Sequence, residues 1–150
     1  MYPIYFFILA ILGSIVQFTF SHVKPLETIL LWLLISNVGL QGLFAFIGHF
    51  FMADKVAKGI GWPINNPFQT EIAFTNLAFG ILGILCIWLT GNFWAAVIIG
   101  RSIFLFGAAY THIRELRINN NRNSYNIGPV LWLSGIIIPI LLLGLLILTI

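Results

Sequence analysis

Long apolar runs separated by short polar connections dominate the chain. The runs cover residues 3–21, 28–51, 67–89, 93–113 and 128–150. The hydrocarbon core of a bilayer is about 30 Å thick and a helix rises about 1.5 Å per residue, so each run is long enough to cross it. Because lipid offers no partners for backbone hydrogen bonds, such runs fold as helices, and the alternating pattern of a β-barrel is absent. The pattern predicts an all-α integral membrane protein, a single-domain bundle of five transmembrane helices with short connections.

Composition agrees with lipid as the solvent. Hydrophobic residues make up 60% of the chain and charged residues only 7%, with a mean hydropathy of +1.03, whereas soluble domains are about one quarter charged. The net charge of +3 does not indicate a nucleic-acid partner, because the basic residues lie in connections between apolar runs. The only cysteine, Cys86, lies inside a run, so no disulfide framework is expected. The first run lacks a basic start and a small-residue cleavage site, which predicts an uncleaved span.

The basic residues predict an orientation. The connections after the second and fourth runs hold Lys55, Lys58, Arg114, Arg117 and Arg122. The connections after the first and third runs hold only Lys24. Cytoplasmic loops of membrane proteins carry the excess of Lys and Arg. We therefore expect the N-terminus in the cytoplasm and the C-terminus outside.

Two polar connections have features of their own. Residues 52–62 have the spacing of a short helix lying in the membrane interface. Asn66, Pro67 and Gln69 fit the N-cap, first and third positions of the next helix, with Gln69 completing a capping box. The connection R-E-L-R-I-N-N-N-R-N-S-Y-N, residues 114–126, is expected to extend the fourth helix and then form a flexible loop.

Polar and small residues form one stripe on each of the three middle helices. At 100° per residue, the stripes are Asn37, Gln41, Ala45 and Gly48; Gln69, Ala73, Asn76, Gly80 and Gly83; and Trp94, Arg101, Leu105, Ala108, His112 and Glu115. The small residues suit a packing seam between helices. Asn37, Gln41, Asn76 and Arg101 lie near the middle of their runs, so we expect them to share a layer near the bilayer midplane.

Arg101 is the most informative of these residues. An arginine at the centre of a membrane helix costs about 2.5–3.5 kcal/mol on insertion scales, so it needs partners. Either the amides hold it as a structural element, or it binds an anionic or strongly polar ligand. On the second hypothesis Arg101, Asn76, Gln41 and Asn37 line the site, and Glu71 and Gln69 lie along a cytoplasmic approach. Glu71, the nearest acid, points about 140° away from the Asn76 stripe, which disfavours a direct ion pair.

Two histidines suggest a further alternative. His49 and His112 end the second and fourth runs on the same side, and Glu115 follows His112 by one turn. Histidines with a carboxylate can hold a transition metal, and two histidines can be the axial ligands of a haem. The spacing matches no known ligand motif, so no cofactor is predicted outright. The chain also lacks the nucleophile, phosphate-loop and dinucleotide motifs of enzymes, which favours a non-enzymatic role.

One segment carries a family resemblance. The sequence G-W-P-I-N-N-P-F-Q-T-E-I-A-F-T-N-L-A-F-G-I-L-G, followed by N-F-W-A-A and T-H-I-R, resembles a family of small prokaryotic multi-pass membrane proteins known only as a domain of unknown function. The resemblance covers about residues 40–140. It implies an all-helical fold in the prokaryotic plasma membrane and no activity.

Three hypotheses of function follow from these patterns. The leading one is a protein that binds or transports a small anionic or polar molecule, as a homodimer if it transports. The second is a structural or accessory subunit of a larger membrane complex. The third is a haem- or metal-binding membrane protein.

Overall fold

The computed structural model describes residues 2–20 and 24–149, and this part of the chain is helical without strands. The helices are α1 (Tyr2–Phe20), α2 (Pro25–Leu33), η1 (Leu34–Leu40), α3 (Gln41–Phe51), α4 (Ala53–Ile60), α5 (Phe68–Leu85), α6 (Asn92–Asn119), α7 (Ser124–Ile127), η2 (Val130–Ile137) and α8 (Ile138–Thr149). Five continuous stretches are long and apolar enough to cross a membrane: Tyr2–Phe20, Pro25–Phe51, Phe68–Leu85, Asn92–Asn119 and Ser124–Thr149. The prediction of five apolar helices is confirmed. The predicted extension of the fourth helix beyond residue 113 is confirmed, because α6 continues to Asn119.

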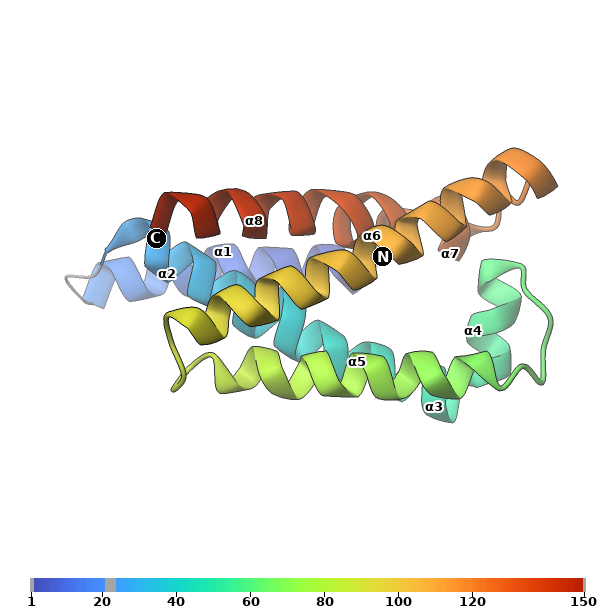
Figure 1. The fold of residues 1–150 in the computed structure, drawn as a ribbon, viewed down its shortest axis with the longest axis horizontal. Helices are drawn as coiled ribbons and strands as arrows, with labels where there is room; N and C mark the ends of the chain where they lie inside the picture. The colour runs from blue at the N-terminus through green and yellow to red at the C-terminus, as the bar shows by residue number, and fades with distance from the viewer. Residues whose placement is uncertain (1, 21–23, 150) are drawn as a thin grey trace.

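Two of these five stretches contain a π-helical segment, η1 and η2. A π-helix widens the turn and shifts the direction of the side chains that follow it. On either side of η1, the second stretch changes its neighbours: α2 packs against α1 and α8, whereas α3 packs against α5. Figure 1 shows this transfer, with α2 in the upper layer and α3 beside α5 in the lower one. The bend in η1 thus joins the two layers.

Glycines form the closest helix contact, between the second and third stretches. A Cβ added at Gly83 would lie 2.4 Å from the backbone nitrogen of Gly39. A Cβ at Gly42 would lie 2.9 Å from the Cα of Gly80. Gly80 and Gly83 were expected at a packing seam and do lie there. Gly48 lies outside the seam, because a Cβ there would meet only a side chain of α4.

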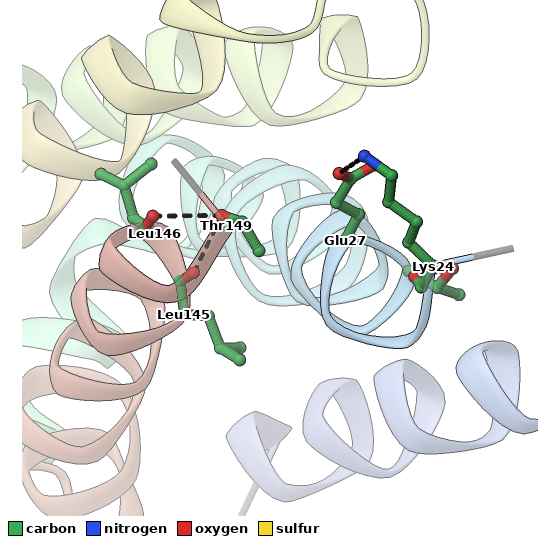
Figure 2. A network of polar contacts seen from close by, with 6 residues as sticks. Lys24, Glu27, Leu145, Leu146 and Thr149 are labelled. Atoms are coloured by element: carbon green, nitrogen blue, oxygen red, sulfur yellow. Dashed lines mark hydrogen bonds and ion pairs between the residues drawn. The ribbon is translucent and has the colours of Figure 1, made fainter.

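Apolar side chains fill the end of the bundle where α2 begins and α8 ends. Leu30, Leu34, Ile98, Ile138 and Leu142 are almost completely buried there. Figure 2 shows the polar contacts at this end. Lys24 Nζ donates to Glu27 Oε1 over 2.7 Å, and this hydrogen bond, aided by the carboxylate charge, raises the pKa of Lys24. The end is therefore densely packed, and its ion pair is at the surface.

The connection before α5 is ordered much as its sequence suggests. The short helix expected over residues 52–62 is present as α4, and Gly61 ends it with a φ of +87°. The Asn66 side chain accepts a hydrogen bond from the Phe68 N–H over 2.9 Å, at the start of α5. Gln69 does not complete a capping box, because its side chain bonds to His49 instead. Gln69 is buried, as its place on the Asn76 stripe suggested.

Two asparagines of the connection predicted to be a flexible loop are buried. Asn126 is fully buried and Asn121 is 8% exposed. Asn121 Nδ2 donates to the Ile60 carbonyl over 2.8 Å, which ties the loop to the end of α4. Each amide side chain donates and accepts hydrogen bonds, so these residues replace the solvent that a polar loop would otherwise need.

Candidate functional site

A cavity of about 690 Å³ is lined mainly by residues of α3, α5, α6 and η2, and also by residues of α1, α4 and α7. Six of the residues predicted for ligand or metal binding line it: Gln41, His49, Gln69, Asn76, Arg101 and His112. Three do not: Asn37, Glu71 and Glu115. Most of the remaining lining is apolar and includes Phe44, Trp62, Phe68, Ile72, Phe104 and Leu105.

Arg101 lies on α6, and its side chain is buried with few hydrogen-bond partners. It is only 2% exposed, and its Nη1 donates to Asn76 Oδ1 over 3.1 Å. The guanidinium carbon lies 5.4 Å from the ring centre of Phe79 and 5.3 Å from that of Phe104, within cation–π range. Its Nε is buried without a partner among the described residues. A guanidinium has five N–H donors, so one hydrogen bond leaves it largely unsatisfied.

Asn76 is held in the orientation that Arg101 requires. Its Nδ2 donates to the Ile72 carbonyl, one turn earlier in α5, over 2.9 Å. A carbonyl only accepts hydrogen bonds, so this contact identifies the nitrogen end of the amide and directs Oδ1 toward the guanidinium. The predicted pairing of Asn76 with Arg101 is therefore present, with its direction fixed by the helix backbone.

Gln41 links the two π-helical stretches beside this pair. Its Nε2 donates to Ser134 Oγ over 2.6 Å. Asn37 Nδ2 lies 3.4 Å from Gln41 Oε1. Asn37 therefore contacts Gln41, but it does not line the cavity itself. Sequence reasoning missed Ser134. It is the only hydroxyl, amide or charged side chain between residues 128 and 148, and this isolation in an apolar run could have marked it as a candidate site residue.

Glu71 and Glu115 are not brought to the cavity. Glu71 is exposed on the outer side of α5, as its angle from the Asn76 stripe suggested. Both carboxylate oxygens of Glu115 accept from Asn119 Nδ2 over 3.0 Å. Within residues 2–20 and 24–149, no three His, Cys, Asp or Glu side chains lie close enough to hold a metal ion. The structure thus brings two of the three predicted metal ligands to one cavity and leaves the carboxylate outside.

The two histidines lie at the far end of the cavity, each held by an amide. His49 Nδ1 is 2.7 Å from Gln69 Oε1, and His112 Nδ1 is 2.7 Å from Asn126 Oδ1. Trp62 stacks on His112 with ring centres 5.6 Å apart and planes 6° apart. Asn126 and Trp62 are contacts of His112 that helical periodicity did not reveal, because both lie in predicted connections.

Comparison with known protein families gives a match along the whole chain. The model of a family of unknown function, DUF6790, matches residues 1–150. The chain belongs to the DUF6790 family. The resemblance to an uncharacterised family is thereby confirmed. No curated protein and no solved structure matches this DUF6790 chain, so its site is interpreted from its own geometry.

The cavity of this DUF6790 protein carries cationic groups and no acid among its described lining. Lys55, on α4, lines it together with Arg101, and no Asp or Glu does. Charges of one sign in a recess with low-dielectric walls raise the local concentration of oppositely charged molecules. The arrangement is therefore suited to attracting an anion and to burying an apolar body beside it.

Proposed function

We propose that this DUF6790 protein binds a small amphiphilic molecule through an anionic group. Arg101 and Asn76 hold the anion, Gln41 lies beside them, and the aromatic lining takes the apolar body. The observation that carries the proposal is the charge of Arg101. It is buried next to a cavity, makes one hydrogen bond among the described residues and has no carboxylate partner there.

The energetics favour an anionic ligand over an empty site. A charged guanidinium at this depth keeps a high desolvation cost unless its donors are satisfied. A carboxylate or phosphate oxygen would accept hydrogen bonds from the forked donors of Arg101, and such charge-assisted bonds are about twice as strong as neutral ones. The volume of about 690 Å³ falls within the range of about 300–1,000 Å³ that is usual for small-molecule sites.

The proposal extends to the setting of the protein. On this proposal the protein lies in the plasma membrane of a prokaryote with α4 and α7 at the cytoplasmic face, which the five apolar helices, the family resemblance and the excess of Lys and Arg in cytoplasmic loops support. The ligand would then reach Arg101 from that face, past Lys55. Because five helices are few for a complete transport pathway, transport would involve a homodimer.

A structural role is the second candidate, and the two cation–π contacts of Arg101 favour it. Phe79 and Phe104 already place their rings beside the charge, and on this alternative the guanidinium serves only to join α5 to α6 in a subunit of a larger complex. In that case replacing Arg101 with leucine removes the charge together with its desolvation cost and is neutral or stabilising. Stabilisation by an anionic ligand then distinguishes the binding function from the structural role.

The experiment is a thermal-unfolding assay on the protein in lipid nanodiscs. Lauric acid is compared with lauryl alcohol, which has the same chain without the charge. We expect lauric acid to raise the unfolding temperature of the original protein, by an amount equivalent to about 2.7 kcal/mol at a hundred times its dissociation constant. Arg101→Lys should keep part of the effect, since an ammonium lacks the planar fork. Arg101→Leu should lose it.

Arg114→Leu is the matched control, because Arg114 is an exposed arginine on the same helix. It should respond to lauric acid like the original protein. Equal stabilisation of the original protein and of Arg101→Leu by lauric acid, or equal stabilisation by acid and alcohol, would show that Arg101 does not anchor an anion.

A further inference from the structure

The end of the cavity farthest from Arg101 has a polar site of its own, centred on His112. This side chain lines the cavity and is 9% exposed. Its imidazole makes one hydrogen bond within the described part of the chain, from Nδ1 to Asn126 Oδ1 over 2.7 Å. The second ring nitrogen, Nε2, is available to form a hydrogen bond with a ligand in the cavity.

The contacts of Asn126 determine which nitrogen of His112 carries the hydrogen. Asn126 Nδ2 donates to the backbone carbonyls of Asn121, over 2.8 Å, and of His112, over 3.2 Å. The atom that faces the imidazole is therefore the amide oxygen, which only accepts. His112 Nδ1 must donate, so the neutral ring presents a lone pair on Nε2. The fold thus builds a hydrogen-bond acceptor into this end of the cavity.

An unsatisfied donor lies at the same end. Gln69 is 2% exposed and lines the cavity, and its Nε2 has no partner among the described residues. Trp62 connects the two groups, since it stacks on His112 and its ring centre lies 6.0 Å from that of Phe68, the neighbour of Gln69. Leaving a buried amide donor unsatisfied costs about 1–3 kcal/mol, so this end is suited to a group that both donates and accepts, such as a hydroxyl.

The two polar ends face the same way along α6. Arg101 and His112 are eleven residues apart, which corresponds to about 16 Å of rise and to nearly the same face of the helix. Between them the cavity is lined by Leu105, Ala108 and Ala109. The polar residue that α6 adds to the lining between them is Thr111, whose hydroxyl already donates to the Gly107 carbonyl over 3.1 Å. The rest of this surface is apolar, so it suits a hydrocarbon chain.

We propose that the ligand is an elongated anionic amphiphile with a hydroxyl group at the end remote from its anion. This inference rests on the proposed function, which supplies the anion at Arg101. The hydroxyl donates to His112 Nε2 and accepts from Gln69 Nε2. The site then selects its ligand by the terminal hydroxyl as well as by the negative charge.

The test compares lauric acid with ω-hydroxylauric acid, which differs only by the terminal hydroxyl. Binding to the protein in nanodiscs is measured by thermal shift and by titration calorimetry. We expect ω-hydroxylauric acid to bind about tenfold more tightly, the effect of one buried hydrogen bond. His112→Asn keeps a donor near the Nδ1 position for Asn126 but lacks the distal acceptor, so the two acids should bind it equally. His112→Gln places an amide oxygen near the Nε2 position and should restore part of the preference.

The outcomes distinguish a failure of the hydroxyl site from a failure of the proposed anion-binding function. If both acids bind the original protein equally and Arg101→Leu binds neither, the anion site stands and the hydroxyl site is overturned. If neither acid binds the original protein, or Arg101→Leu binds both, the proposed function fails and the inference with it. A tenfold preference that persists in His112→Asn would exclude His112 as its origin. A Soret band in protein made with haem available, abolished by His112→Asn, would mean that Nε2 ligates iron. That result would also overturn the hydroxyl site.

Discussion

At the scale of single residues, two asparagines use the same arrangement at the two ends of the cavity. Asn76 Nδ2 binds the Ile72 carbonyl and its Oδ1 accepts from Arg101. Asn126 Nδ2 binds two carbonyls and its Oδ1 accepts from His112. In both cases a backbone carbonyl fixes which end of the amide is which. The asparagine then presents an acceptor of known direction to a cavity-lining cation or imidazole.

Asn126 should therefore be important for stability despite its place in a polar connection. Asn126→Ala leaves His112 Nδ1 and two carbonyls without this partner in a fully buried site. At about 1–3 kcal/mol for an unsatisfied buried group, we expect a loss of about 3 kcal/mol in the free energy of unfolding. Equilibrium unfolding in mixed micelles measures it. Asn119→Ala, at an exposed position, is the control and should change stability by less than about 0.5 kcal/mol. Equal effects of the two substitutions would contradict the packed connection.

At the scale of elements, the irregular helices coincide with the site. Gln41 directly follows η1 and Ser134 lies within η2, and the two side chains share a hydrogen bond of 2.6 Å. π-Helical turns are rare and are frequently found at functional sites. Here the wider turns place polar side chains from two apolar stretches at the edge of one cavity. The same irregularity lets α3 leave the layer of α2 and pack on α5 through the glycine contact.

That glycine contact makes a second stability prediction. Gly83→Ala places a Cβ 2.4 Å from the Gly39 nitrogen, and neither backbone can move without shifting its helix. Overpacking of this kind costs about 1–3 kcal/mol, so the unfolding temperature should fall. Gly144→Ala is the matched control, because a Cβ there meets nothing within 4 Å. It should be neutral or slightly stabilising, since alanine favours a helix over glycine. A Gly83→Ala protein as stable as Gly144→Ala would show that the helices do not approach this closely.

At the scale of the whole molecule, the two ends differ in charge. At the end where α2 begins, the exposed Lys24 is paired with Glu27. The opposite end, with α4 and α7, carries Lys55, Lys58, Arg114, Arg117 and Arg122. This asymmetry predicts that the α4 and α7 end faces the cytoplasm. The end of the cavity lined by Lys55 and His112 would then lie nearest the cytoplasm.

Cysteine labelling in cells tests this orientation. Asn119→Cys lies at the predicted cytoplasmic end, and Asn92→Cys lies at the opposite end of the same helix. An impermeant maleimide should label Asn92→Cys in intact spheroplasts and Asn119→Cys only after lysis. The native Cys86 is completely buried, so it should give little background. Labelling of both positions from one side would contradict a single crossing by α6.

Local patterns in the sequence determined the helical elements. Hydropathy and length predicted the five apolar helices, and the spacing of residues 52–62 predicted α4. The cap at Asn66 also followed from local chemistry, because its hydrogen bond reaches only to Phe68. The stripes on the middle helices predicted that Asn76 and Arg101 would meet, since both are mid-helix polar residues on inward faces. These features depend on residues within a few turns of one another, which is the range that a periodic pattern describes.

The tertiary structure alone decided how the site is completed. Gln41 and Ser134 are 93 positions apart, and no local pattern relates them. The π-helical turns rotate the side chains that follow them, so a constant 100° per residue cannot give their directions. Asn126 was expected in a solvated loop because its neighbours are polar, yet α4 and α6 bury it. Each of these outcomes depends on contacts between segments distant in sequence, and packing geometry, rather than residue type, determines which of them form.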